Sequence, residues 1–240
     1  MLRRVVLLFL LMAGSVLATE EFRVFHVGDR TVSARIVSVD LRRDQVVLEL
    51  RNKRRKKVSP SIFSQEDQDY INDYVKVKEF LSSRYKVEIK KNILDRRDET
   101  VGTQGAIERK TETICYDINI SNGTDTTIEG VSIAYNIFYE QEELGRRDNE
   151  AREFYVDDSL TIKSLLPREK TSFRTKKFEI YSQRLGGGYD GYVDGHATHQ
   201  SGKSKGIWLK IYLKTPSGLS AMKEVCLPKN GKSIFRWQSS

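Results

Sequence analysis

The sequence contains few of the residues on which most enzymes and metal sites depend. Its 240 residues include only three histidines and two cysteines. No serine or cysteine lies in a nucleophile-elbow or papain-like context, and no cluster has the spacing of a standard zinc or calcium motif. We therefore expect a protein that is not an enzyme and that binds no cofactor and no metal.

Long apolar runs are also missing, apart from one at the start of the chain. Arg3 and Arg4 precede the apolar residues 5–12, and small residues follow up to Ala18. This order is typical of a signal peptide, so we expect cleavage of residues 1–18 and a periplasmic or extracellular location. No later run approaches the ~20 apolar residues that a membrane helix requires, so we expect no transmembrane segment in the mature chain. The alternative is that the first segment is retained as an anchor.

Acidic residues are fewer than basic residues in this chain. Lys and Arg number 41 against 33 Asp and Glu, which gives a formal net charge of +8. A basic balance favours acidic polymers and anionic headgroups as partners. Export argues against nucleic acid as a partner. We therefore expect the binding partner to be a protein, a peptide or an anionic polymer of the cell envelope.

The two cysteines, Cys115 and Cys226, lie in strand-like segments. An exported chain meets an oxidising compartment, where an even number of cysteines permits a disulfide. A bridge would close a loop of about 110 residues and contribute roughly 4 kcal/mol. The alternative is two unpaired thiols, because Cys115 alternates out of phase with the apolar Ile114 and Tyr116.

The first unit of the mature chain is predicted to span residues 19–82 and to be mainly β. Alternating apolar residues predict strands at 32–36 and 46–50, and Val58 begins a short third strand. Ser64 is a good N-cap for a following helix. The apolar stripe of that helix predicts a core-facing side made of Tyr70, Tyr74, Val77 and Leu81.

Several residues of this unit match a known domain family. They are Phe25, the turn Gly28-Asp29-Arg30, Ala34, Val46-Val47-Leu48, Val58 and the run from Phe63 to Ile71. With these residues the segment resembles the Sla-homology domain, first described in a yeast endocytic adaptor and common in exported proteins of planctomycete and verrucomicrobial bacteria. The resemblance implies a small SH3-like β-barrel with one appended helix. In the yeast protein that fold binds a short peptide containing Asn-Pro-Phe.

The next part of the chain, residues 83–228, has the pattern of a second β-rich unit. Apolar residues alternate with polar ones at 85–89, 114–120, 131–139, 173–180, 207–213 and 225–227. About seven short strands with turn signals between them predict an antiparallel β-sandwich, immunoglobulin-like in kind. The stretches Tyr116–Asn122 and Gly206–Tyr212 resemble sandwich domains that follow Sla-homology domains in exported bacterial proteins. We expect a polar loop at 95–113 and a basic tail at 229–240.

One run of the first unit concentrates positive charge, and we call it the basic cluster. It consists of Arg51, Lys53, Arg54, Arg55, Lys56 and Lys57. A hairpin would project these side chains together. The run replaces the Asp-Gly-Lys turn that is usual at this point in Sla-homology domains. The cluster is the predicted site for a polyanion or a peptide, with an affinity that falls as salt rises. The alternative is a solvated hairpin whose charge protects a sheet edge from pairing.

A long Gly-rich loop is predicted at 183–206. Loops of this length are usually functional or disordered. Tyr189 and Tyr192 could stack on a sugar or a peptide. The loop also holds carboxylates and imidazoles that could converge on a metal, although in no standard spacing: Asp190, Asp194, His196 and His199. The alternative is a flexible hairpin tip.

A second possible ligand face lies on the strand that follows. Trp208 and Tyr212 alternate with the apolar residues of 207–213, so they point to the opposite face, with Lys210 between them. An aromatic and cationic row of this kind can bind carbohydrate or peptide by stacking. The alternative is that the first unit or the long loop covers this face.

Together these patterns predict an exported, non-enzymatic interaction protein. Its SH3-like unit would bind a peptide or an anionic envelope component, and the sandwich would act as scaffold or second binding face. One alternative is a carbohydrate-binding or hydrolytic accessory protein that uses the 183–206 loop. Another is a purely structural component of the envelope.

Overall fold

A computed structural model describes residues 21–102, 107–142, 151–185 and 199–238. The predicted signal peptide, residues 1–18, lies outside these residues. The described chain is mainly β, with antiparallel sheets and two α-helices. Neither helix in this part of the chain is both long and apolar enough to cross a bilayer.

The first sheet contains the N-terminal strands in the order β1-β2-β3-β4, all antiparallel. Its strands are β1 (Arg23–Val27), β2 (Arg30–Asp40), β3 (Gln45–Leu50) and β4 (Arg55–Val58), with short 3-10 turns at Leu41–Arg43 and Pro60–Ile62. Gly28 takes a positive φ of 55° in the β1–β2 turn, a conformation that glycine adopts without strain. The strands predicted at 32–36 and 46–50 are confirmed. The third strand was predicted to begin at Val58, and this is wrong, because β4 ends at that residue. Strand β1 was not predicted.

Helix α1 (Gln65–Leu81) packs against this sheet. Its N-cap is Ser64, as predicted, because the Ser64 hydroxyl accepts a hydrogen bond from the Asp67 N–H at 3.3 Å. The buried Asp67 carboxylate also ties the helix to β1, since it accepts from Arg23 at 2.7 Å and from the His26 N–H at 2.6 Å. The predicted core-facing stripe is confirmed for Tyr74 and Val77, which are buried.

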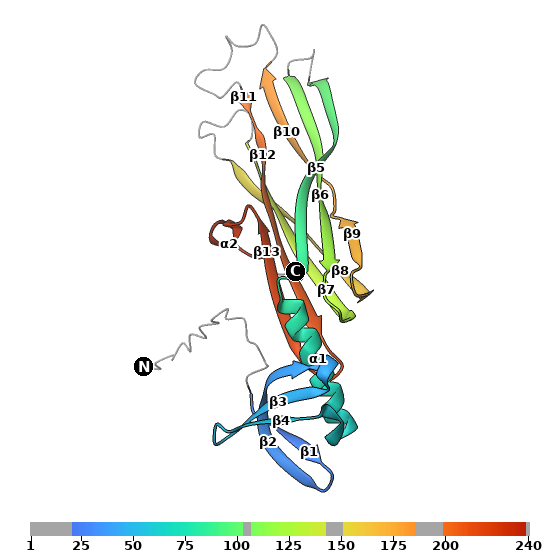
Figure 1. Cartoon of the computed structure of the whole chain (residues 1–240). Coiled ribbons are helices and arrows are strands. Elements are labelled where there is room, and N and C mark those ends of the chain that lie inside the picture. The colour runs from blue at the N-terminus through green and yellow to red at the C-terminus, as the bar shows by residue number, and fades with distance from the viewer. Residues whose placement is uncertain (1–20, 103–106, 143–150, 186–198, 239–240) are drawn as a thin grey trace, which may run out of the picture.

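The remaining strands form two further antiparallel sheets, which Figure 1 shows above the first. The second sheet has the order β11-β10-β6-β5, with β9 also paired to β6. Its strands are β5 (Tyr85–Val101), β6 (Ile107–Asn122), β9 (Lys170–Arg174), β10 (Phe178–Leu185) and β11 (His199–Gln200). The third sheet has the order β13-β12-β7-β8. Its strands are β7 (Ile128–Gln141), β8 (Arg152–Leu165), β12 (Gly202–Lys214) and β13 (Ser220–Leu227).

The second and third sheets pack face to face. The Tyr116 hydroxyl on β6 lies 2.8 Å from the Ser204 hydroxyl on β12, and the rings of Tyr139 and Phe178 stack with centroids 5.2 Å apart. Between the sheets lies a layer of alternate, fully buried residues, including Ile118, Ile120, Ile133, Ile137, Leu209 and Ile211. This alternation is the pattern from which the strands were predicted.

The polar loop predicted at 95–113 is wrong in most of its length. Residues up to Val101 continue β5, and β6 begins at Ile107. The hairpin carries charge on both faces, so its sequence lacks the alternation that marks a half-buried strand. Cross-strand ion pairs take the place of apolar packing, for example Arg96 with Glu112 at 3.0 Å. The 183–206 loop is likewise shorter than predicted, because both of its ends belong to β10, β11 and β12.

The first unit is held against the third sheet through α1. Asp73 accepts a 3.0 Å hydrogen bond from the backbone N–H of Ser217 in the β12–β13 turn. From β13, Lys223 donates to the carbonyl oxygens of Ser82 and Tyr85 at 2.9 Å each. Figure 1 shows α1 beside the end of the β12–β13 hairpin. The two units are therefore in direct contact.

The predicted basic tail, residues 229–240, is instead packed onto the third sheet as far as it is described. It contains a short helix, α2 (Gly231–Ile234). Phe235 stacks on Phe138 with centroids 4.3 Å apart, and Trp237 packs edge-on against Trp208 at 5.6 Å. Aromatic side chains near the end of the chain are thus covered, and the segment belongs to the fold.

The predicted disulfide does not form, because Cys115 and Cys226 are both free thiols. Cys115 pairs with Asn92 in the register of β5 and β6, and burial raises the pKa of its thiol. Cys226 lies opposite Trp208 in the register of β12 and β13, on the face away from the second sheet. The two residues therefore point out of opposite sheets that stack about 10 Å apart, whereas a disulfide needs Cα atoms within roughly 7 Å.

Candidate functional site

The basic cluster lies on the β3–β4 turn and on β4 itself. The turn is fixed by backbone hydrogen bonds, from Lys53 N to Leu50 O at 2.8 Å and from Leu50 N to Arg54 O at 2.9 Å. The Asn52 side chain accepts from the Arg54 N–H at 3.1 Å, and Lys53 takes a positive φ of 64°. The last three basic residues continue as β4. The sequence predicted a hairpin or loop here, and the structure places the charges on both a turn and a strand.

All six basic side chains of the cluster are exposed. Arg51 donates to the Ser33 hydroxyl at 3.0 Å and lies over the Phe22 ring at 5.4 Å. Arg55 is paired with Glu49 at 3.3 Å. Within the described residues, no carboxylate is paired with Lys53, Arg54, Lys56 or Lys57. Four cations of the cluster are therefore available to an anion from outside.

One carboxylate sits inside this positive field. Glu49 lies between Arg35 on β2 and Arg55 on β4, which are its neighbours in the register of the sheet. Arg35 donates to it from two nitrogens, at 3.0 and 2.7 Å. The Arg35 hydrogen bond holds the pKa of Glu49 below its ordinary range. Glu49 therefore keeps its negative charge between the guanidinium groups of Arg35 and Arg55.

β4 is an edge strand, since β3 is its one partner in the sheet. Backbone bonds in an antiparallel pair alternate between bonded and non-bonded residues. Because Leu50 bonds to Arg54, the same alternation directs the backbone groups of Lys56 and Val58 toward β3. It directs the N–H and C=O groups of Arg55 and Lys57 toward the free edge. The cluster thus combines positive side chains with backbone donors and acceptors that have no partner strand among the described residues.

The predicted aromatic face of β12 is largely covered. Trp208 and Tyr212 do point away from the buried residues of their strand. The C-terminal segment covers Trp208, and Lys210 lies 4.2 Å from the centre of the Trp237 ring. Tyr212 remains 38% exposed. The sequence analysis offered the first unit or the long loop as cover for this face. It did not predict that the C-terminal segment covers Trp208.

The other predicted ligand residues give no site in the described chain. Tyr189, Tyr192, Asp190, Asp194 and His196 lie outside the described residues. His199 begins β11 and is exposed. The described residues contain no group of three or more His, Cys, Asp or Glu side chains arranged to hold a metal ion.

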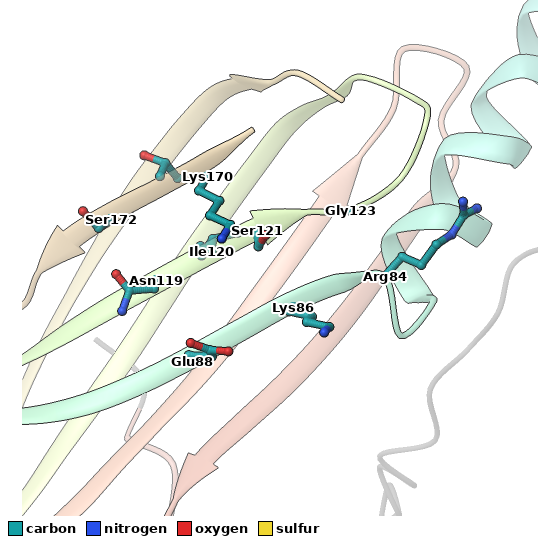
Figure 2. A pocket seen from close by; sticks show the side chains of 10 residues that line it. Arg84, Lys86, Glu88, Asn119, Ile120, Ser121, Gly123, Lys170 and Ser172 are labelled. Atoms are coloured by element: carbon teal, nitrogen blue, oxygen red, sulfur yellow. The ribbon is translucent and has the colours of Figure 1, made fainter. Parts of the chain in front are cut away.

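A groove that the sequence did not predict lies on the outer face of the second sheet. It has a volume of about 650 Å³ and crosses β5, β6 and β9 (Figure 2). Its polar lining includes Lys86, Glu88, Asn119, Lys170 and Ser172. Alternation along each strand could have placed these side chains outward, but no sequence signal showed that the three strands are neighbours.

Comparisons with known proteins identify no relative. No protein-family model matches the chain, and no curated protein matches it. Among solved structures, the X-ray structure of Northeast Structural Genomics Consortium target SoR45 matches with 10% sequence identity and a TM-score of 0.28. The match covers 67% of this chain and 98% of the other. A similarity at this level assigns neither a fold family nor a function.

Proposed function

We propose that this chain is an exported interaction protein, not an enzyme, that binds an anionic envelope polymer or an acidic peptide through its first unit. In this proposal residues 19–82 are an SH3-like barrel of the Sla-homology type. Residues 83–228 are an immunoglobulin-like sandwich that serves as its scaffold. The basic cluster is the binding site.

One observation carries the proposal: four exposed cations of the cluster have no acidic partner among the described residues. Ion pairs elsewhere on the surface are common, for example Arg174 with Asp117 at 2.9 Å and Arg168 with Asp125 at 2.9 Å. Uncompensated positive charge on one short turn and strand produces a local field that concentrates anions. Lys53, Arg54, Lys56 and Lys57 provide that field.

The free edge of β4 suggests how an extended acidic peptide would lie. Such a peptide would add a strand beside β4 and bond to the backbone groups of Arg55 and Lys57. Alternate acidic side chains, about 7 Å apart along an extended chain, would then meet the side chains of the cluster. A flexible polyanion would use the side chains alone.

A heparin column tests the proposal. The test variant carries glutamine at all six cluster positions. The matched control carries glutamine at six exposed lysines outside the cluster: Lys91, Lys163, Lys177, Lys203, Lys214 and Lys229. Both variants lose the same net charge. We expect the cluster variant to elute at clearly lower salt than the control, and equal elution of the two variants would refute the proposal.

A further inference from the structure

The groove on the second sheet is built from side chains in register on three strands. Antiparallel pairing places Lys86 on β5 opposite Ser121 on β6, and Ser121 opposite Lys170 on β9. We call these three residues the lysine row. Figure 2 shows the Lys170 side chain lying over β6 beside Ser121. Two ammonium groups thus flank one hydroxyl.

The next row along the same face has a different chemistry. Glu88 on β5 lies opposite Asn119 on β6, and Asn119 lies opposite Ser172 on β9. We call these residues the carboxylate–amide row. It is about 7 Å from the lysine row, because outward residues alternate along a strand. A ligand in the groove would meet positive charge at one row and hydrogen-bonding groups at the other.

At both ends of the groove, charged side chains are paired with one another. Beyond the carboxylate–amide row, Asp117 accepts from Arg174 at 2.9 Å and from Asn92 at 3.0 Å. The hydrogen bond with Arg174 lowers the pKa of Asp117, which therefore stays charged and paired. At the other end, Arg84 is paired with Asp125 at 3.4 Å. Asp117, Arg174 and Arg84 therefore already have partners of opposite charge.

Inside the groove the side chains have no such partners. Among the described residues, none forms a hydrogen bond or an ion pair with the side chains of Lys86, Glu88, Asn119, Lys170 or Ser172. Figure 2 shows them on the neighbouring strands that line the groove. These polar groups of both signs converge on one concave surface, where they are available to orient a small polar ligand.

We propose that this groove binds an acidic sugar, such as a uronic acid residue of a polysaccharide. The sugar carboxylate would lie between the ammonium groups of Lys86 and Lys170. Its ring hydroxyls would donate to Glu88 and would exchange hydrogen bonds with Asn119 and Ser172. The site belongs to the second unit and is independent of the basic cluster.

The chemistry of the rows separates this ligand from related ones. Inorganic phosphate or sulfate offers negative charge to the lysine row but has no ring hydroxyls to reach the carboxylate–amide row, so Glu88, which only accepts hydrogen bonds when ionised, would stay without a donor. A neutral sugar would leave Lys86 and Lys170 without a counter-charge. It would also lack aromatic stacking, since the residues that line the groove include no aromatic side chain.

Isothermal titration calorimetry with the galacturonic acid trimer tests the proposal on the full-length protein. The neutral galactose trimer is the ligand control. A Lys86→Gln, Lys170→Gln double variant removes both ammonium groups. We expect it to weaken binding by about tenfold or more, since a charged hydrogen bond is worth more than about 1.4 kcal/mol. The Lys163→Gln, Lys214→Gln variant makes the same charge change on the third sheet and should bind as the wild type does.

The proposal would be overturned by no binding of the acidic trimer, by equal binding of the neutral trimer, or by equal weakening in the two double variants. Displacement of the trimer by an equal concentration of sulfate would reduce the groove to a simple anion site and would also overturn it. Loss of trimer binding in the basic-cluster variant alone would assign the sugar to the first unit instead. Thermal melting of each variant confirms that it is folded.

Discussion

Asp73 on α1 accepts a 3.0 Å hydrogen bond from the backbone N–H of Ser217, a residue 144 positions further along the chain. The same carboxylate accepts from Lys76 at 2.9 Å. Burial disfavours the charged form, but these two hydrogen bonds outweigh it and lower the pKa of Asp73. A single carboxylate therefore joins the helix of the first unit to the turn between β12 and β13.

Replacement of this carboxylate should destabilise the protein. Asp73→Ala leaves the Ser217 N–H without its acceptor, so we expect the free energy of unfolding to fall by about 1–3 kcal/mol. Urea denaturation measures the change. Asp98→Ala, on the exposed β5–β6 hairpin, is the control and should stay within about 0.5 kcal/mol of wild type. Equal stability of both variants would show that the contact does not hold the units together.

The Glu49 carboxylate should limit polyanion binding at the basic cluster. Glu49→Gln removes the negative charge between Arg35 and Arg55, so we expect retention on heparin to increase. Glu129→Gln changes the same charge at an exposed site on β7 and should leave retention unchanged. A decrease with Glu49→Gln would mean that the ion pairs position the cluster and do not restrain it.

The same residue gives a dependence of stability on pH. The pKa of Glu49 is lower in the folded protein than the value of about 4.3 in an unfolded chain. Its contribution to stability is therefore complete above the unfolded value and is lost as the pH falls through the folded value. By the linkage relation, the difference in the free energy of unfolding between wild type and Glu49→Gln should be constant from about pH 6 to about pH 8. It should shrink below about pH 4.

The C-terminal segment should contribute to the stability of the third sheet. Phe235 is 9% exposed and stacks on Phe138, whereas its neighbour Ile234 is 55% exposed. We expect Phe235→Ala to lower the free energy of unfolding by about 3 kcal/mol and Ile234→Ala to change it by less than about 0.5 kcal/mol. Chemical denaturation compares the two. A small effect of Phe235→Ala would mean that the segment does not pack in solution.

The sequence predicted strands well where one face is buried. Residues 207–213 alternate cleanly, and every second one is buried in β12. Strand β8 was missed because it is an edge strand and mostly exposed. Its alternating apolar pattern is also interrupted by Asp157 and Asp158. The charged hairpin of β5 and β6 was missed because its side chains are mostly charged and exposed and do not alternate with apolar ones. Where pairing depends on charges across strands, apolar periodicity contains no signal.

The candidate sites also differ in how far the sequence could predict them. The basic cluster is contiguous in the sequence, so its existence could be predicted from residues 51–57 alone. Its free edge could not, because strand order depends on which strands pair. The groove gathers residues near 86, 120 and 171, which only the register brings together. The cover over Trp208 likewise required contacts between distant segments.

The most direct test of the central claim is the salt dependence of heparin binding. Binding by several cations releases counterions, so the logarithm of the association constant falls linearly with the logarithm of salt concentration. We predict a steep slope for the wild type and for the variant that lacks the six scattered lysines. The variant with glutamine at all six cluster positions should give a clearly shallower slope and weaker binding. If the cluster variant keeps the wild-type slope and affinity, the basic cluster is not the binding site.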